Sequence, residues 1–226
     1  MAKRVGADSL AVDVFQRLRE DIFSHRIEPG ARLKPVQLSE QFQVSTGVIR
    51  EALNLLAAQG LLRIERNKGF HVITLSAKAY SDLIVARKLN EGAALRMSVE
   101  RGGVAWESEL LAAHHKLAKE PVKITNGSSQ YNPAWSQAHA AFHYALIQAC
   151  EIPILLDICV RLSDAAEVYR AWAARHRVDS SGIAAEHEAL LEAALAHDAD
   201  LAVSRFEQHI DHTKGILLAQ ELKTIG

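Results

Sequence analysis

The spacing of apolar side chains changes twice along the chain. Helical stretches with an apolar residue every three or four positions give way, after residue 60, to two stretches in which apolar and polar residues alternate. Beyond residue 76 the spacing is helical throughout. We therefore expect a mainly α-helical protein with an N-terminal domain over residues 1–76 and a C-terminal domain over residues 77–226. The 226 residues are enough for a core in each.

The N-terminal domain has the element order of a winged helix-turn-helix. The expected elements are helices at 9–25, 36–42 and 45–59 and a β-hairpin of strands at 61–64 and 70–74. Only Gln43, Val44 and Ser45 link the second helix to the third, which Gly60 would end in a left-handed cap. In DNA-binding winged helices the third helix enters the major groove, and a basic hairpin tip approaches the backbone or minor groove. The pattern alone also fits a winged helix that binds another protein.

The C-terminal domain is expected to be an antiparallel bundle of six helices. The predicted helices span 77–101, 104–119, 132–150, 152–177, 182–197 and 199–221. Their connections are mostly short, which favours antiparallel neighbours. The longest connection, residues 121–131, is polar and is predicted to be a loop without strands.

Four histidines occupy inward-facing helical positions of this bundle. His139 and His143 are four residues apart on the apolar face of one helix, His187 lies among leucines of another, and His209 follows Phe206 on the last. A buried imidazole left without a hydrogen bond costs about 1–3 kcal/mol, so each needs a partner. Four such side chains in one core predict a metal site. The alternative is four core histidines satisfied without a metal.

Arg87 and Glu91 fall on the inward stripe of the first bundle helix, four residues apart. As an exposed pair they would contribute a few tenths of a kcal/mol, roughly the value of any helical ion pair. As a buried pair, the guanidinium held by Glu91 would be available to a ligand carboxylate, which it binds in a bidentate fork. We expect Arg87 to bind a small carboxylate effector, together with Tyr169.

Charge and composition favour an anionic partner and a reducing compartment. Residues 1–78 carry 12 Lys/Arg and 8 Asp/Glu, a net charge of +4, whereas the remainder carries a net −5. The basic N-terminal part favours an anionic partner. Cys150 and Cys159 fall on apolar helical positions and are interpreted as core thiols, which fits a reducing compartment. With no membrane-length apolar run and no signal peptide, the protein is expected in the cytoplasm.

The N-terminal motifs resemble the DNA-binding domain of GntR-family regulators over the first 75 residues. The matching runs are Pro29-Gly30-Ala31-Arg32-Leu33, Leu38-Ser39-Glu40, Val44-Ser45-Thr46-Gly47-Val48-Ile49-Arg50-Glu51-Ala52-Leu53, Gly60-Leu61 and Gly69-Phe70-His71-Val72. The DNA-contacting residues predicted on this basis are Arg32, Ser45, Thr46, Gly47, Arg50, Lys68 and Gly69. Two positions depart from the family: Thr46 replaces a common arginine, and Val36 replaces a basic residue found in many members. These departures put the usual family operator in doubt.

The C-terminal motifs resemble the FCD ligand-binding domain of one GntR branch, in its shorter VanR-like form. The marks are Arg87-x-x-x-Glu91, Phe142-His143, Glu186-His187 and His209, and the details are most similar to the carbon-starvation-induced regulators. In this branch an Asp-x-x-x-His pair and two further histidines hold a divalent metal, so the resemblance implies the ligands His139, His143, His187 and His209. His139 replaces the aspartate. Four neutral imidazoles suit Zn²⁺, Ni²⁺ or Co²⁺ better than Mg²⁺ or Ca²⁺.

The resemblance implies a transcriptional regulator, expected to be a repressor, that binds a double-stranded DNA operator as a homodimer. A small carboxylate metabolite at the metal would change its affinity for the operator. One alternative is a metal-responsive regulator in which the metal itself is the effector. Another is a metal-dependent enzyme, but no His-Glu-x-x-His motif accompanies the histidines, so we expect no enzymatic activity.

Overall fold

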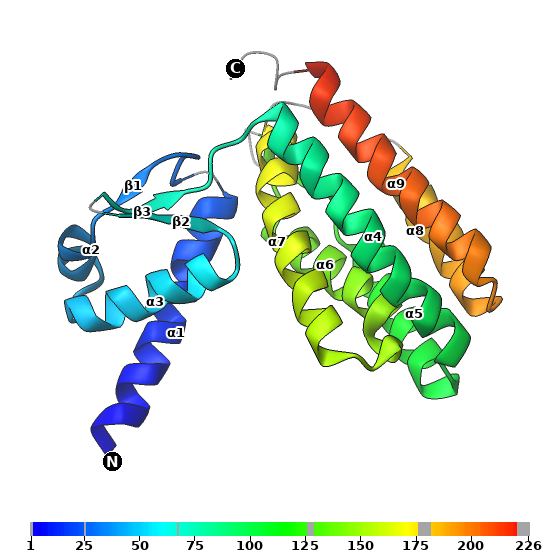
Figure 1. Cartoon of the computed structure of the whole chain (residues 1–226), viewed down its shortest axis with the longest axis horizontal. Helices are drawn as coiled ribbons and strands as arrows, with labels where there is room; N and C mark the ends of the chain where they lie inside the picture. The colour runs from blue at the N-terminus through cyan, green and yellow to red at the C-terminus, as the bar shows by residue number, and fades with distance from the viewer. Residues whose placement is uncertain (1, 25, 67, 126–128, 176–181, 221–226) are drawn as a thin grey trace. The chain divides into compact units, whose positions relative to one another are not determined.

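A computed structural model describes residues 2–24, 26–66, 68–125, 129–175 and 182–220 (Figure 1). The chain forms two compact units, Met1–Leu75 and Ser76–Gly226. Each is described by itself below. Among the described residues, no helix is both long and apolar enough to cross a membrane.

The first unit consists of three helices and a three-stranded antiparallel sheet. Its elements are α1 (Ala2–Phe23), β1 (Arg32–Leu33), α2 (Pro35–Phe42), α3 (Thr46–Ala58), β2 (Leu62–Glu65) and β3 (Gly69–Val72). α2 begins with Pro35 and ends at Gln43, whose φ of 53° turns the chain sharply. The Ser45 side chain then accepts a hydrogen bond from the Val48 amide at 3.3 Å and so caps α3. These local signals produce the predicted helix-turn-helix.

Two features of this unit differ from the prediction. α1 begins at Ala2 rather than residue 9. The sheet has the order β1-β3-β2, because the two-residue strand β1 pairs with β3 through Arg32↔His71 and Leu33↔Phe70. A strand this short cannot show alternation in the sequence. The hairpin of β2 and β3 itself was predicted, and its register pairs Leu62 with Val72.

The second unit is a helical bundle with one small hairpin. Its elements are α4 (Ala77–Arg101), α5 (Val104–Lys119), β4 (Lys123–Thr125), β5 (Ser129–Tyr131), α6 (Pro133–Ile147), the 3₁₀ turn η1 (Gln148–Cys150), α7 (Pro153–Arg175), α8 (Ile183–Leu195) and α9 (Ala199–Gln220). The six predicted helices are confirmed. The prediction of a strandless loop at 121–131 is wrong, since β4 and β5 pair antiparallel from Lys123↔Tyr131 to Thr125↔Ser129. Strands of three residues, with one apolar or aromatic side chain each, are too short to show an alternation from which to predict them.

α4 is the central helix of the bundle and packs against α9, α7 and α6 (Figure 1). α5 packs on α6, and α8 on α9. Large side chains from these helices, such as Tyr80, Leu95, Phe142 and Phe206, are almost fully buried. The buried set also contains polar side chains, and these mark the candidate site. They are Arg87, Glu91, Ser98, Asn132, His139, His143, Asp164, Glu167, His187 and His209.

Candidate metal centre and DNA-binding surface

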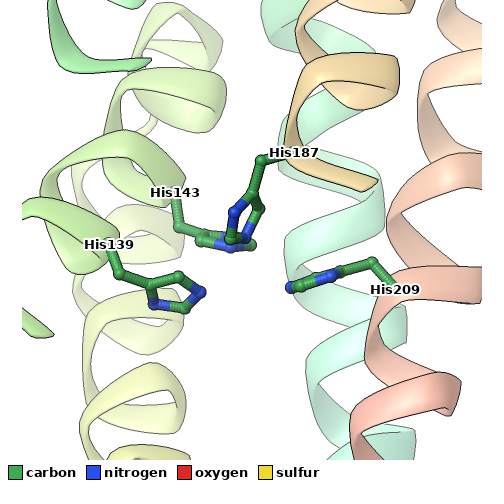
Figure 2. A group of neighbouring side chains, drawn as sticks. All are labelled: His139, His143, His187 and His209. Carbon is green, nitrogen blue, oxygen red and sulfur yellow. The ribbon is translucent and has the colours of Figure 1, made fainter. Parts of the chain in front are cut away.

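The four predicted histidines converge on one point inside the bundle. Figure 2 shows His139 and His143 reaching from α6 toward His187 on α8 and His209 on α9. One ring nitrogen from each lies within 4.8 Å of those of the other three. At most 6% of each residue is exposed. The arrangement brings together the donor set that a divalent transition metal requires.

Local structure fixes the two histidines of α6. Asn132 accepts a hydrogen bond from the Ala134 amide and donates one to the Pro121 carbonyl, so the start of α6 is anchored. The spacing of four residues then turns His139 and His143 to the same face, with ring centroids 4.4 Å apart. Trp135, one turn earlier, stacks on His139 at 4.6 Å. The two histidines of α6 therefore share one face, and Trp135 packs against His139.

The site keeps its imidazoles neutral and leaves their nitrogens unpaired. Burial lowers the pKa of His139, His143 and His187 well below the usual value, and neighbouring positive charges lower it further. Within the described residues, Nδ1 of His139, both ring nitrogens of His143 and Nε2 of His187 have no hydrogen-bond partner. Unpaired buried nitrogens destabilise a core, and coordination of a cation would satisfy them.

Glu186 orients the fourth histidine, a role that the sequence analysis did not assign. Its Oε2 lies 2.7 Å from Nδ1 of His209, and its Oε1 is bonded to Nδ1 of His212. A carboxylate only accepts, so Nδ1 of His209 carries the proton and Nε2 keeps its lone pair for a metal. Burial raises the pKa of Glu186, but the bonds to the two histidines outweigh it and bring that pKa below its usual value. His212 is largely exposed and lies outside the four-histidine group.

Arg87 and Glu91 form a buried pair, as the sharper of the two sequence interpretations predicts. Nε and Nη2 of Arg87 donate to the two carboxylate oxygens of Glu91 at 2.6 and 2.8 Å. Each residue is only 3% exposed. The positive charge of Arg87 adds to burial in lowering the pKa of His143 and His209.

Tyr169 is buried on α7, and its hydroxyl oxygen is already engaged. Its ring stacks on Tyr80 of α4, with ring centroids 4.5 Å apart. Burial raises the pKa of Tyr169, and a hydrogen bond that its oxygen accepts from the backbone of Ser76 opposes that rise. The hydroxyl therefore keeps its own proton, which it can donate.

The residues predicted to contact DNA lie on the surface of the first unit. Arg32 on β1, Arg50 on α3 and Lys68 at the tip of the hairpin are exposed, as are Ser45, Thr46 and Gly47, and Gly69 is partly so. The opposite face of α3, formed by Val48, Ile49, Ala52, Leu53 and Leu56, is buried. Lys68 pairs with Glu65 at 3.2 Å. α3 thus presents Arg50 to solvent from a helix that is firmly packed behind.

Comparison with known proteins matches each unit to a protein family. The model for bacterial regulatory proteins of the gntR family matches residues 10–72, and that for the FCD domain matches residues 82–212. The chain belongs to the GntR family. It carries the FCD domain as its C-terminal part, so the two resemblances found in the sequence are confirmed.

Several relatives of this GntR-family chain are similar over most of its length. The HTH-type transcriptional regulator BphR of Paraburkholderia xenovorans is 34% identical, over 92% of this chain and 85% of its own. The HTH-type transcriptional repressor GlaR of Escherichia coli is 30% identical, over 88% and 92%. The gluconate operon transcriptional repressor of Bacillus licheniformis is also 30% identical, over 96% and 90%.

The solved structure of E. coli McbR/YncC shares the fold, with a TM-score of 0.74 at 21% identity, over 93% of this chain and 98% of that one. The family model and the relatives identify the protein as a DNA-binding transcriptional regulator.

Proposed function

We propose that the protein is a repressor whose affinity for its operator is controlled by a small carboxylate bound at a metal in the FCD domain. The observation that carries this proposal is the group of four buried histidines, three of which have ring nitrogens without a hydrogen bond in the described part of the chain, together with the buried Arg87–Glu91 pair. Two of the relatives above are named repressors, which supports the direction of control.

His139, His143, His187 and His209 would hold the metal, and Zn²⁺ or Ni²⁺ fits them best. All four donors are neutral nitrogens, which borderline metals prefer and hard ions such as Mg²⁺ do not. When bound, the metal supplies an open coordination position for a carboxylate oxygen. The protein contributes fixed donor positions and excludes water through the surrounding Trp135 and Phe142 rings.

Arg87 would bind the effector carboxylate. Its Nε and Nη2 are committed to Glu91, so the pair holds the guanidinium in place while Nη1 takes no part in that fork. Tyr169, whose hydroxyl keeps its proton, would be a second donor to that carboxylate. A carboxylate is favoured over a neutral ligand because a buried guanidinium and a metal cation both bind anions.

Two first units in a homodimer would bind one pseudo-palindromic operator. A single winged helix covers about half of such a site, so a second copy is needed for specific binding. Arg50 and its neighbours Thr46 and Gly47 on α3 would face base edges, while Arg32, Ser45, Lys68 and Gly69 would contact the backbone or minor groove. Effector binding in the bundle would then change the fraction of dimers in which both α3 helices can bind the operator.

The first test measures the metal content of purified, untagged protein by mass spectrometry, before and after dialysis against a chelator. We expect about one Zn or Ni per chain, in line with the one four-donor group found in the described part of the chain, and a lower melting temperature after removal. Protein that is purified without metal, binds none on addition of Zn²⁺ or Ni²⁺ and melts unchanged would contradict the metal site.

The second test measures affinity for a duplex selected from a random-sequence library, by fluorescence anisotropy, with metal-loaded protein and a panel of small carboxylates. Release of the duplex by a carboxylate supports the proposal. Release by addition of metal alone, with no response to any carboxylate, would support the metal-responsive regulator instead.

A further inference from the structure

A surface pocket of about 350 Å³ lies between α8 and α9 and borders the candidate metal centre. Its polar lining includes Glu186 on α8 and Gln208, His209 and His212 on α9. Among the described residues that line it, His209 is the one that also belongs to the four-histidine group. Gln208 and His212 are exposed, so solvent reaches to within one side chain of the buried donors.

One carboxylate, that of Glu186, joins the exposed side of this pocket to the buried group. Its Oε2 lies 2.7 Å from Nδ1 of His209, whose side chain is 7% exposed. Its Oε1 is bonded to Nδ1 of His212, whose side chain is 45% exposed. A carboxylate and an imidazole are both ligands that Zn²⁺ and Ni²⁺ accept. A cation from solvent can therefore bind between Glu186 and His212 by replacing the proton that they share.

The other three histidines lie against aromatic rings, which have no lone pair to replace a water ligand of an ion. The ring pairs and their centroid distances are Trp135 and His139 at 4.6 Å, Phe142 and His187 at 5.4 Å, and Phe142 and His143 at 5.6 Å. A divalent ion that crossed such a wall would lose water without gaining ligands, which is costly. Glu186 and His212 instead offer donors that lead from solvent to His209.

We propose that the metal enters and leaves the bundle through this pocket, and that Glu186 and His212 bind the ion before His209 takes it inward. This inference rests on the proposed function, which supplies the four-histidine site as the destination. An ion held by Glu186 competes with the bond from Nδ1 of His209 to the same carboxylate. The imidazole is then free to turn toward the ion and to carry it to the other three histidines. Release follows the same steps in reverse.

The charges around the pocket act on the ion in opposite directions. The bonds from His209 and His212 outweigh burial and bring the pKa of Glu186 below its usual value, so the carboxylate is charged at neutral pH. Arg205 also lines the pocket, is exposed, and donates from Nη1 to Gln208 at 3.4 Å. Its charge repels a cation, so Arg205→Gln should speed metal entry, and by more at low salt. Slower entry in that variant would contradict this route.

The main test measures rates of metal exchange by stopped-flow fluorescence. Zn²⁺ entry into metal-free protein is followed with a weak zinc indicator, and release is followed with an excess of a strong fluorescent chelator. His212→Gln keeps a donor for Glu186 but loses the imidazole, and should slow entry and release by about fivefold or more. The dissociation constant should change less than twofold, because a residue on the path alters the barrier and not the two end states. His115→Gln, at an exposed position on α5, is the control and should keep both rates.

A second pair of variants tests the pocket itself. Ala185 on α8 lines the pocket, and its exposed neighbour Ala184 is not among the described lining residues. Ala185→Leu should narrow the pocket and slow both entry and release by about threefold or more, again without a change in the dissociation constant. Ala184→Leu adds the same side chain outside the pocket and should leave both rates as in the wild type.

The measurements separate failure of this route from failure of the metal site. Unchanged rates in either His212→Gln or Ala185→Leu would overturn the inference and leave the proposed function standing. Weaker binding with an unchanged entry rate in His212→Gln would also overturn it, because His212 would then support only the bound state. If wild-type protein bound no Zn²⁺ at all, the proposed function would fail first, and the inference with it.

Discussion

The two units place their functional side chains in opposite environments. In the winged helix, Arg50 and Lys68 are exposed on elements whose other face forms the core. In the bundle, the histidines and Arg87 lie within the core itself. Mutation of a DNA-contacting side chain should therefore leave stability unchanged. Mutation or titration of a ligand-binding side chain should change binding and stability together, because the same atoms serve both.

The chain also allows the two units to be observed separately. All three tryptophans and all four tyrosines lie between residues 80 and 172. Tryptophan fluorescence therefore reports unfolding of the bundle alone, whereas far-ultraviolet circular dichroism reports both units. The predictions below use this difference.

The largest expected effect is acid destabilisation of the metal-free bundle. Burial lowers the pKa of His139, His143, His187 and His209 in the folded state, so the unfolded chain binds more protons below its pKa of about 6.5. The stability from these neutral histidines is present above that pH and is lost as the pH falls. Each contributes a slope of up to about 1.4 kcal/mol per pH unit, so four contribute up to roughly 5.6 kcal/mol per pH unit. Urea unfolding followed by tryptophan fluorescence between pH 7 and 5 measures it.

Two variants control that measurement. His143→Leu removes a histidine with two unpaired nitrogens, so it should reduce the slope by about a quarter and stabilise the metal-free bundle at pH 6. His115→Gln changes an exposed histidine on α5 and should leave the slope unchanged. A free energy of unfolding that stays flat from pH 7 to 5 in the wild type would contradict the burial of neutral imidazoles.

Arg50→Ala should give the next largest effect, a loss of affinity for DNA without a loss of stability. Loss of a contact to a base edge typically costs about 2 kcal/mol, about 30-fold in affinity for the selected duplex. Because the Arg50 side chain is exposed, circular dichroism melts should match the wild type. Arg50→Lys keeps the charge but loses the planar fork, so partial recovery is expected for random duplex and less for the selected one. Undiminished affinity for the selected duplex would place Arg50 outside the interface.

Both units show which features a single sequence reveals. The spacing of His139 and His143 already predicts a shared face, and Ser45 already predicts the cap of α3, because both depend on local helical geometry. The bond between Glu186 and His209 joins helices whose relative rotation is fixed only by packing. The same holds for Tyr80, whose unpaired hydroxyl becomes visible only when every neighbouring element is in place.

Glu186→Gln should weaken the metal site without emptying it. The amide keeps a hydrogen-bond acceptor for Nδ1 of His209 but loses the charge that makes the imidazole a better ligand, and such changes cost about tenfold or more in metal affinity. Competition with a fluorescent chelator measures the dissociation constant. Glu192→Gln, an exposed glutamate on the same helix, is the matched control and should bind metal as the wild type does. Equal affinity in both variants would mean that Glu186 does not tune His209.

Lys68→Ala should have the smallest effect on affinity for DNA. The loss should be independent of sequence and dependent on salt, as expected for an exposed contact with phosphate. A phosphate contact carries no sequence information, so affinity should fall a few-fold for selected and random duplex alike, and the slope of log affinity against log salt should decrease by about 1. Glu65 keeps its bond to Arg63 at 2.7 Å, so the hairpin should stay folded. Lys116→Ala removes an equally exposed lysine from the bundle and should leave the slope unchanged. An equal decrease of the slope in both variants would mean that the FCD domain also contacts DNA. DNA binding would then not be confined to the first unit.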